Sequence, residues 1–180
     1  MRSSAASDVY KRQVYNLKQM AAALQYLKEH QLFEYDDLAA KTDAATERFH
    51  TLAGDIQQTE AELSRVSDLM AAVVQYAKTR PAFDGYKAAK YSRKYLAEHE
   101  AELADYRAAK AAMAELLGGE KLPKMDVLKE KRRQLAARKK ALYLEYRKAQ
   151  QDMRELVAVK GSVDHLRGLT DSQRNKEQAR

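Results

Sequence analysis

Residues 35–77 read YDDLAAKTDAATERFHTLAGDIQQTEAELSRVSDLMAAVVQYA. Apolar or small side chains recur here at alternating intervals of three and four residues, which is the pattern of a coiled-coil stripe. The stripe consists of Tyr35, Leu38, Thr42, Ala45, Phe49, Leu52, Ile56, Thr59, Leu63, Val66, Met70, Val73 and Ala77. Gly54 falls on the side of the predicted helix that faces away from this stripe. Such a helix would extend about 65 Å, so the sequence predicts helices paired along their length.

Pro81 is expected to end this helix near residue 79, because proline lacks a backbone N–H and disfavours helix at the residue before it. The chain would then turn back over residues 79–85. A second long helix is predicted over residues 84–117, ending at Gly118 and Gly119. Its stripe contains Leu96, His99, Leu103, Tyr106, Lys110, Met113 and Leu117.

A third long helix is predicted over residues 124–159, after Pro123. Leucines or alanines recur one heptad apart, at Leu128, Leu135, Leu142, Ala149 and Leu156. Arg132 and Lys139 fall at the companion positions, so two basic residues would occupy this stripe.

A short amphipathic helix is predicted over residues 14–30, and residues 170–180 are polar enough to be a disordered tail. The predicted fold class is all-α: an elongated antiparallel coiled-coil-like bundle of three long helices plus a short N-terminal helix. Residues 14–169 would form this helical region.

The composition supports thin packing, because 33% of the 180 residues are charged and only 8% are aromatic. The absence of cysteine excludes disulfides and thiolate metal sites and fits a reducing compartment. No apolar run approaches the length of a membrane span, and the start of the chain has no signal-peptide core. We therefore expect a cytoplasmic protein that does not associate with membranes.

Residues 8–13 spell DVYKRQ, which is similar to one translated frame of a transposase adaptor used in preparing sequencing libraries. We interpret residues 1–13 as a non-native, adaptor-derived segment. The natural chain would then enter near Val14, with its own N-terminal part missing. A natural basic tail is the alternative interpretation.

Charge is distributed unevenly along the chain. Residues 120–148 carry a net charge of +7, and residues 29–68 carry a net charge of −7. The basic helix could neutralise the acidic one, with Arg132 and Lys139 meeting Asp55, Glu60 or Glu62. Alternatively, the basic residues could form an outward phosphate-binding surface. The residues proposed for that surface are Arg133, Arg138, Lys140 and Lys148.

Basic and aromatic residues also alternate over residues 76–95. Cations that contact phosphates and rings that stack on bases are typical of single-strand binding. The candidate nucleic-acid-binding residues here are Lys87, Lys90, Tyr91, Arg93 and Lys94. The alternative is that the tyrosines pack within the protein and keep only their hydroxyls in water.

No catalytic or metal-binding pattern is evident in the sequence. The four histidines, His30, His50, His99 and His165, are far apart and lack metal-ligand spacing. Gly118 and Gly119 do not form a phosphate-binding loop. We therefore expect no enzymatic activity, no cofactor and no metal ion.

Three strings carry a family resemblance: VYNLKQMAAALQYLKEHQL at 14–32, VVQYAKTRPAFDGYKAAKYSRKYLAEHEAEL at 73–103, and EYRKAQQDMRELVAVKGSVDHLRGL at 145–169. Together with Leu122 and Pro123 they resemble the C-terminal helical region of relaxases, the mobilisation nucleases of conjugative and mobilisable elements of Gram-positive gut bacteria. In that family an N-terminal domain with a catalytic tyrosine and a histidine-bound metal nicks DNA. None of those motifs is present here, so the resemblance implies a non-catalytic fragment of a DNA-processing protein.

The function expected from this resemblance is to help hold DNA, in particular single strands, or to dock proteins of the conjugation machinery. A coiled-coil scaffold or oligomerisation module without a nucleic-acid role is the alternative. The imperfect apolar stripes of the three long helices can pack against one another within one chain. We therefore expect a monomer in preference to a homodimer.

Overall fold

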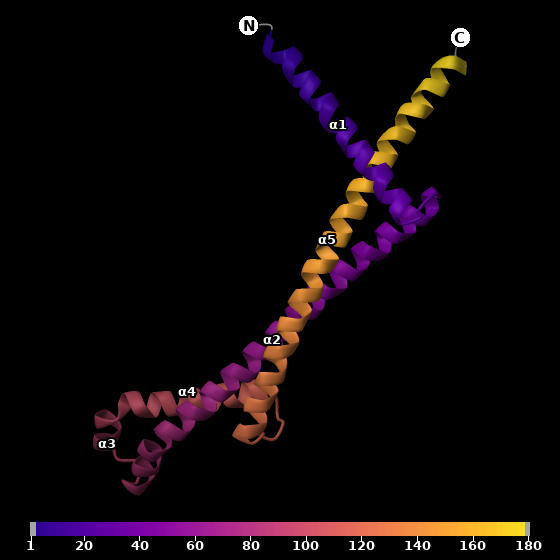
Figure 1. Ribbon diagram of the computed structural model, residues 1–180. Helices are drawn as coiled ribbons and strands as arrows, with labels where there is room; N and C mark the ends of the chain where they lie inside the picture. The colour runs from indigo at the N-terminus through magenta and orange to yellow at the C-terminus, as the bar shows by residue number, and fades with distance from the viewer. Residues whose placement is uncertain (1–2, 179–180) are drawn as a thin grey trace. The chain divides into compact units, whose positions relative to one another are not determined.

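The structure is a computed structural model that describes the backbone of residues 3–178 and the side chains of residues 9–168. It confirms the all-α class, since the described backbone forms helices and no strand (Figure 1). The helices are α1 (Ser3–Glu29), α2 (Tyr35–Ala88), α3 (Arg93–Glu98), α4 (Glu100–Leu117) and α5 (Met125–Gln178).

The chain divides into two compact units. The terminal unit comprises Met1–Gly54 and Leu144–Arg180, and the central unit comprises Asp55–Tyr143. The long helices α2 and α5 contribute residues to both units. Each unit has a buried core of its own.

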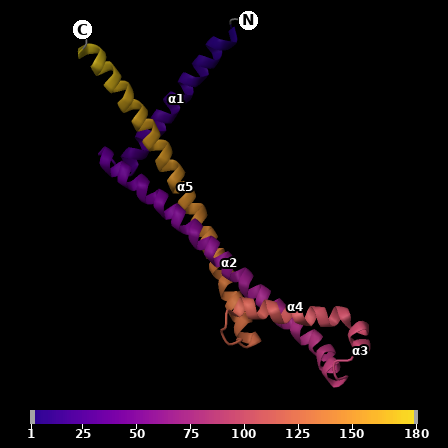
Figure 2. The same ribbon diagram turned by 180° about the vertical axis from the view of Figure 1, so that it is seen from behind.

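In the terminal unit, α1 packs against α5, and the start of α2 completes the core. Figures 1 and 2 both draw α1 and α5 crossing, and Ala23 of α1 and Val159 of α5 line one shared hollow. The buried core consists of Ala23, Leu38, Leu156 and Val159. Small side chains on α1 therefore allow it to approach α5 closely.

The turn from α1 to α2 fixes how the chain enters this core. Gln31 adopts a left-handed φ of 55°, and the Leu32 N–H donates to the Leu27 carbonyl at 2.9 Å. This hydrogen-bond pattern is a Schellman motif, which satisfies carbonyls at a helix end. Leu27 and Leu32 both pack on the terminal core, so the motif carries its usual apolar contact.

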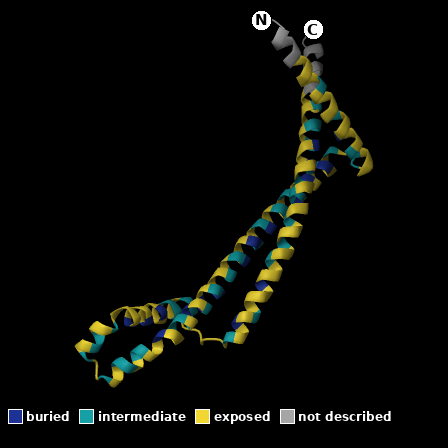
Figure 3. Ribbon diagram, turned by 60° about the vertical axis from the view of Figure 1, so that its left-hand side comes forward, coloured by how far each residue is buried: buried dark blue, intermediate teal, exposed yellow. Residues whose placement is uncertain are grey.

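In the central unit, α2, α4 and the first turns of α5 share one core. Its buried members are Val66, Leu69, Leu128 and Leu135, and Figure 3 shows buried positions recurring along these helices. Arg65 of α2 donates two hydrogen bonds, of 3.1 and 2.6 Å, to the Leu116 carbonyl. That carbonyl lies in the last turn of α4, where no intrahelical donor remains, so Arg65 ties the end of α4 to α2.

Burial follows much of the predicted α2 stripe. Buried stripe members include Leu38, Thr42, Leu52, Ile56, Thr59 and Val66, whereas Ala77 is exposed. Beyond Val66 the buried positions become Leu69, Ala72 and Thr79, because α4 now packs on this part of α2. In α5, Leu128, Leu135, Ala149 and Leu156 are buried as predicted, and Leu142 is half-buried.

The prediction that Pro81 ends the long helix is wrong, because α2 continues through Pro81 to Ala88. Proline removes one hydrogen bond to the carbonyl four residues earlier, here that of Ala77. Ala77 is exposed, so water can bond to its carbonyl. The ring of Phe83, stacked on Tyr106 at 4.3 Å, stabilises the turns beyond the proline.

The predicted helix over residues 84–117 is also corrected. Its first residues belong to α2, the chain turns at residues 89–92, and α3 and α4 follow with only His99 between them. His99 lies outside helical geometry, at φ −119° and ψ 25°. Gly118 does end α4 as predicted, in a left-handed conformation with φ 55°.

The outer helices are longer than predicted. The α1 helix begins at Ser3 rather than near residue 14, and α5 continues to Gln178 rather than ending near residue 159. Helix therefore replaces the predicted disordered tail up to residue 178, because Gln, Arg, Lys and Glu all have good helix propensity. Residues 1–2 and 179–180 lie outside the described residues.

Candidate nucleic-acid surface

A group of cations uninterrupted by acidic residues lies in the central unit, where α2 turns into α3. Residues 85–97 contain no acidic residue, and four of them are basic: Lys87, Lys90, Arg93 and Lys94. All four side chains are exposed. We call residues 87–94 the tip segment. The structure thus brings together five predicted site residues: Lys87, Lys90, Tyr91, Arg93 and Lys94.

The backbone of the tip segment is a second Schellman motif. Lys90 and Tyr91 have left-handed φ values of 51° and 61°, a conformation that glycine adopts more readily. The Tyr91 N–H donates to the Tyr86 carbonyl at 3.0 Å, and the Lys90 N–H donates to the Lys87 carbonyl at 2.9 Å. These bonds hold Lys90 and Tyr91 at the outside of the turn.

The ring of Tyr91 is the most accessible one in this region. Its ring meets Tyr86 nearly at right angles, with the centroids 5.2 Å apart, and 57% of the residue remains exposed. An aromatic ring held from one side and open to solvent can stack on a nucleobase. Tyr91 therefore contacts Tyr86 within the turn and still has ring surface on which a nucleobase could stack.

The other aromatic residues near the tip segment pack on one another. Tyr106 of α4 stacks between Tyr76 and Phe83 of α2, at centroid distances of 5.2 and 4.3 Å. A hydrogen bond with Tyr76, together with burial, raises the pKa of Tyr106 above its usual value of 10.0. Tyr95 stacks on His99 at 4.2 Å. For these rings the packing interpretation is correct.

Gly85 allows α3 to pack against the end of α2. A Cβ atom at this position would collide with the hydroxyl and ring of Tyr95. Because Gly85 has no side chain, the ring of Tyr95 can lie directly on the backbone of α2. Tyr95 in turn positions the beginning of α3.

The four residues predicted to form a phosphate surface on α5 are all exposed, and helical spacing places Arg133, Lys140 and Lys148 toward one side of the helix. Arg133 is 80% exposed but pairs with Glu130 at 2.9 Å. Arg138 and Lys140 are exposed, yet two residues along a helix correspond to a rotation of about 200°, so they point to different sides of α5. Lys148 is exposed and belongs to the terminal unit.

The charge-neutralising interpretation is confirmed for Lys139. Its Nζ lies 2.8 Å from Glu60 Oε1, and the Tyr143 hydroxyl donates to the same oxygen at 3.1 Å. Hydrogen bonds from Lys139 and Tyr143 lower the pKa of Glu60, and the bond to Glu60 raises the pKa of Lys139. Arg132, the other predicted stripe residue, is exposed.

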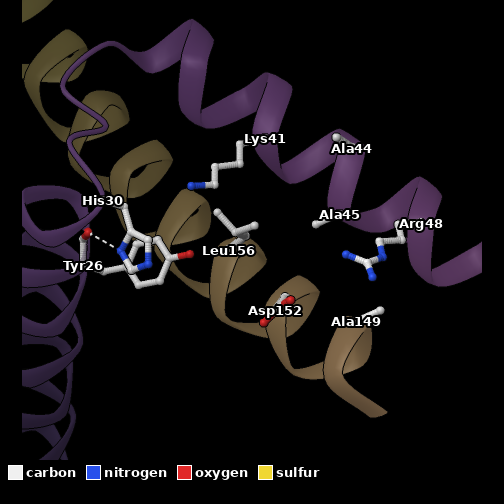
Figure 4. Close-up of a pocket in the computed structure, with 9 residues that line it drawn as sticks. All are labelled: Tyr26, His30, Lys41, Ala44, Ala45, Arg48, Ala149, Asp152 and Leu156. Atoms are coloured by element: carbon white, nitrogen blue, oxygen red, sulfur yellow. Dashed lines mark hydrogen bonds between the residues drawn. The ribbon is translucent and has the colours of Figure 1, made fainter. Parts of the chain in front are cut away.

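A hollow in the terminal unit was not predicted from the sequence. It has a volume of about 390 Å³ and lies between α1, α2 and α5 (Figure 4). Ala45 and Ala149 form part of its wall. Both alanines occupy stripe positions, and small residues on facing stripes were the available signal, since they leave space that a leucine would fill.

Among the described residues, no group of three or more His, Asp or Glu side chains could hold a metal ion. In the same part of the chain, no helix is apolar over enough residues to cross a bilayer.

Comparison with known proteins found no matching family model, no matching curated protein and no matching solved structure.

Proposed function

We propose that this chain is a non-catalytic helical segment that holds single-stranded DNA, of the kind that forms the C-terminal region of relaxases. The sequence resemblance, which covers nearly all of residues 14–169, supports this proposal. In this proposal the chain works in the cytoplasm as a monomer, and proteins of the transfer machinery are its further partners.

The observation that carries the proposal is the tip segment. It presents four exposed cations within residues 85–97, a stretch that contains no acidic residue, and Tyr91 lies exposed among them. Cations supply the salt-dependent attraction to phosphates, and an open ring supplies sequence-tolerant stacking on bases. Single strands can use both contacts, because their bases are not already paired.

A coiled-coil scaffold is the second candidate function. The Lys139–Glu60 pair favours it, since this basic residue is used to hold α5 against α2 inside the central unit. A scaffold of this kind would need the exposed cations only for solubility.

A binding titration separates the two functions. The full chain is added to a fluorescently labelled 20-nucleotide oligothymidine, and anisotropy is measured. The test variant is Lys90→Gln/Arg93→Gln/Lys94→Gln, and the matched control is Lys18→Gln/Lys28→Gln/Lys110→Gln, which removes the same charge from other exposed positions. We expect the test variant to bind at least tenfold more weakly than the control. Equal binding by both variants, or no binding by the unaltered chain, favours the scaffold.

A further inference from the structure

The hollow in the terminal unit has the size and wall of a small-molecule site. Its volume of about 390 Å³ falls in the range of ligand pockets. Ala45 of α2 lies opposite Ala149 and Leu156 of α5, and these apolar side chains form the inner wall. Three helices therefore line an open hollow that their own side chains do not fill.

Charged side chains from α2 and α5 line this space. Lys41 and Arg48 lie seven residues apart on one face of α2, and Figure 4 shows both extending into the hollow. Asp152 reaches it from α5. Among residues 9–168, none of these three makes a hydrogen bond or ion pair. Among the residues that line the hollow, two cations face one carboxylate, so the α2 side of the hollow can hold an anion.

The far side of the hollow is aromatic. The rings of Tyr26 and His30 stack with centroids 3.9 Å apart and planes 18° apart. His30 Nδ1 lies 2.9 Å from the Tyr26 carbonyl oxygen, a contact in which Nδ1–H donates and fixes the imidazole. Burial, and then the charges of Glu155 and Asp152, raise the pKa of Tyr26, and its neutral hydroxyl can donate a hydrogen bond.

We propose that this hollow binds a nucleoside monophosphate. Lys41 and Arg48 hold the phosphate, the base lies against the Tyr26–His30 pair, and Asp152 accepts a hydrogen bond from an amino group of the base. A phosphate ion alone would leave most of the volume and the aromatic wall unused. This inference goes beyond the proposed DNA-holding role and does not rest on it, because none of these residues belongs to the tip segment.

The first test needs no variant. Isothermal titration of the full chain is carried out with AMP, inorganic phosphate and adenosine. We expect AMP to bind at least tenfold more tightly than either part alone, because only AMP uses the cations and the aromatic wall together. If phosphate binds as tightly as AMP, or if AMP does not bind at millimolar concentration, the proposal is wrong.

The second test locates the site. Each of Lys41→Gln and Arg48→Gln should weaken AMP binding about tenfold or more, since each removes a charge-assisted hydrogen bond. Lys110→Gln is the matched control, an exposed lysine of the central unit, and should leave AMP binding unchanged. If the control variant lost as much AMP affinity as the pocket variants, the assignment of AMP binding to this hollow would be wrong. Lys41 is exposed, so its variant is expected to fold, and circular dichroism checks this.

A competition arm identifies the source of the nucleotide. A 5′-phosphorylated oligodeoxyadenosine that displaces AMP shows that the hollow takes the end of a strand, and one that does not displace AMP shows that it takes a free nucleotide. Either result supports the chemistry of the site. The tip variant Lys90→Gln/Arg93→Gln/Lys94→Gln should bind AMP normally, so failure of this inference and failure of the DNA proposal are distinguishable.

Discussion

Lys139 Nζ lies 2.8 Å from Glu60 Oε1 and joins the basic part of α5 to the acidic part of α2 within the central unit. Both side chains are a little over one third exposed, at 38% and 39%. The Tyr143 hydroxyl bonds to the same carboxylate oxygen. A basic residue at a stripe position is thus accommodated by an acid beside the stripe, as in coiled coils with charged flanking positions.

Reversing the charge of Lys139 should destabilise the fold. Lys139→Glu places a second carboxylate beside Glu60 and removes a hydrogen bond, whereas Lys140→Glu makes the same change on an exposed neighbour. Thermal unfolding should therefore show a lower Tm for Lys139→Glu than for Lys140→Glu. Glu60→Lys combined with Lys139→Glu should recover part of the loss. Equal Tm values for the two single variants would mean that the pair contributes nothing.

The same pair predicts a pH dependence. The pKa of Glu60 is lowered from 4.5 in the folded chain, so its contribution to stability is present above that value and is lost as pH falls through the folded pKa. The pKa of Lys139 is raised from 10.5, so its contribution is lost only as pH rises through the still higher folded pKa. The stability difference between the unaltered chain and Lys139→Gln should shrink as pH is lowered from about 7 to about 3. A difference that stays constant over this range would contradict the assignment.

Two exposed glycines inside the long helices should be replaceable with a gain in stability. Gly54 of α2 and Gly161 of α5 have open space where a Cβ would lie. Alanine loses less backbone freedom in a helix than glycine, so Gly54→Ala and Gly161→Ala should each stabilise by about 1 kcal/mol. Chemical denaturation measures this difference.

Gly85→Ala is the internal control for the glycine prediction. A Cβ here would collide with the hydroxyl and ring of Tyr95, and moving Tyr95 would disturb its stacking on His99. We expect destabilisation of about 1–3 kcal/mol from this overpacking. A stabilised Gly85→Ala variant would show that Tyr95 does not rest on the backbone of α2.

Deleting residues 1–13 should leave the Tm unchanged. The structure continues α1 back to Ser3, but every side chain from Val9 to Gln13 is exposed, so these residues bury little surface. Circular dichroism should lose only the helical signal of the removed turns. A Tm lower by several degrees would show that the segment packs on the rest of the chain and would count against its interpretation as foreign.

Periodicity predicted which residues of the long helices are buried better than it predicted where the helices end. Leu38, Leu128 and Leu156 lie on predicted stripes and are among the most buried residues. Helix ends were missed because local rules compete with packing: α2 continues through Pro81, and Phe83, two residues beyond the proline, stacks on Tyr106 of α4. The turn at residues 89–92 carries neither glycine nor proline, so no turn signal marked it.

The candidate sites were predictable only where charge and sequence proximity coincide. Lys87, Lys90 and Lys94 are close in sequence, and the turn keeps them exposed together. The hollow was missed because Tyr26, Lys41 and Asp152 come from three helices. Which faces of those helices meet depends on tertiary packing, which single-helix periodicity does not report.

The DNA-holding role is tested most directly by the salt dependence of single-strand binding. For a single strand, the slope of log K against log salt concentration changes by about 0.7 for each phosphate contact. The variant Lys90→Gln/Arg93→Gln/Lys94→Gln removes three cations of the tip segment. Its slope should be shallower by about 2 than that of the unaltered chain, and the control Lys18→Gln/Lys28→Gln/Lys110→Gln should keep the original slope. Identical slopes for the tip variant and the unaltered chain would contradict the proposal that the tip segment holds DNA.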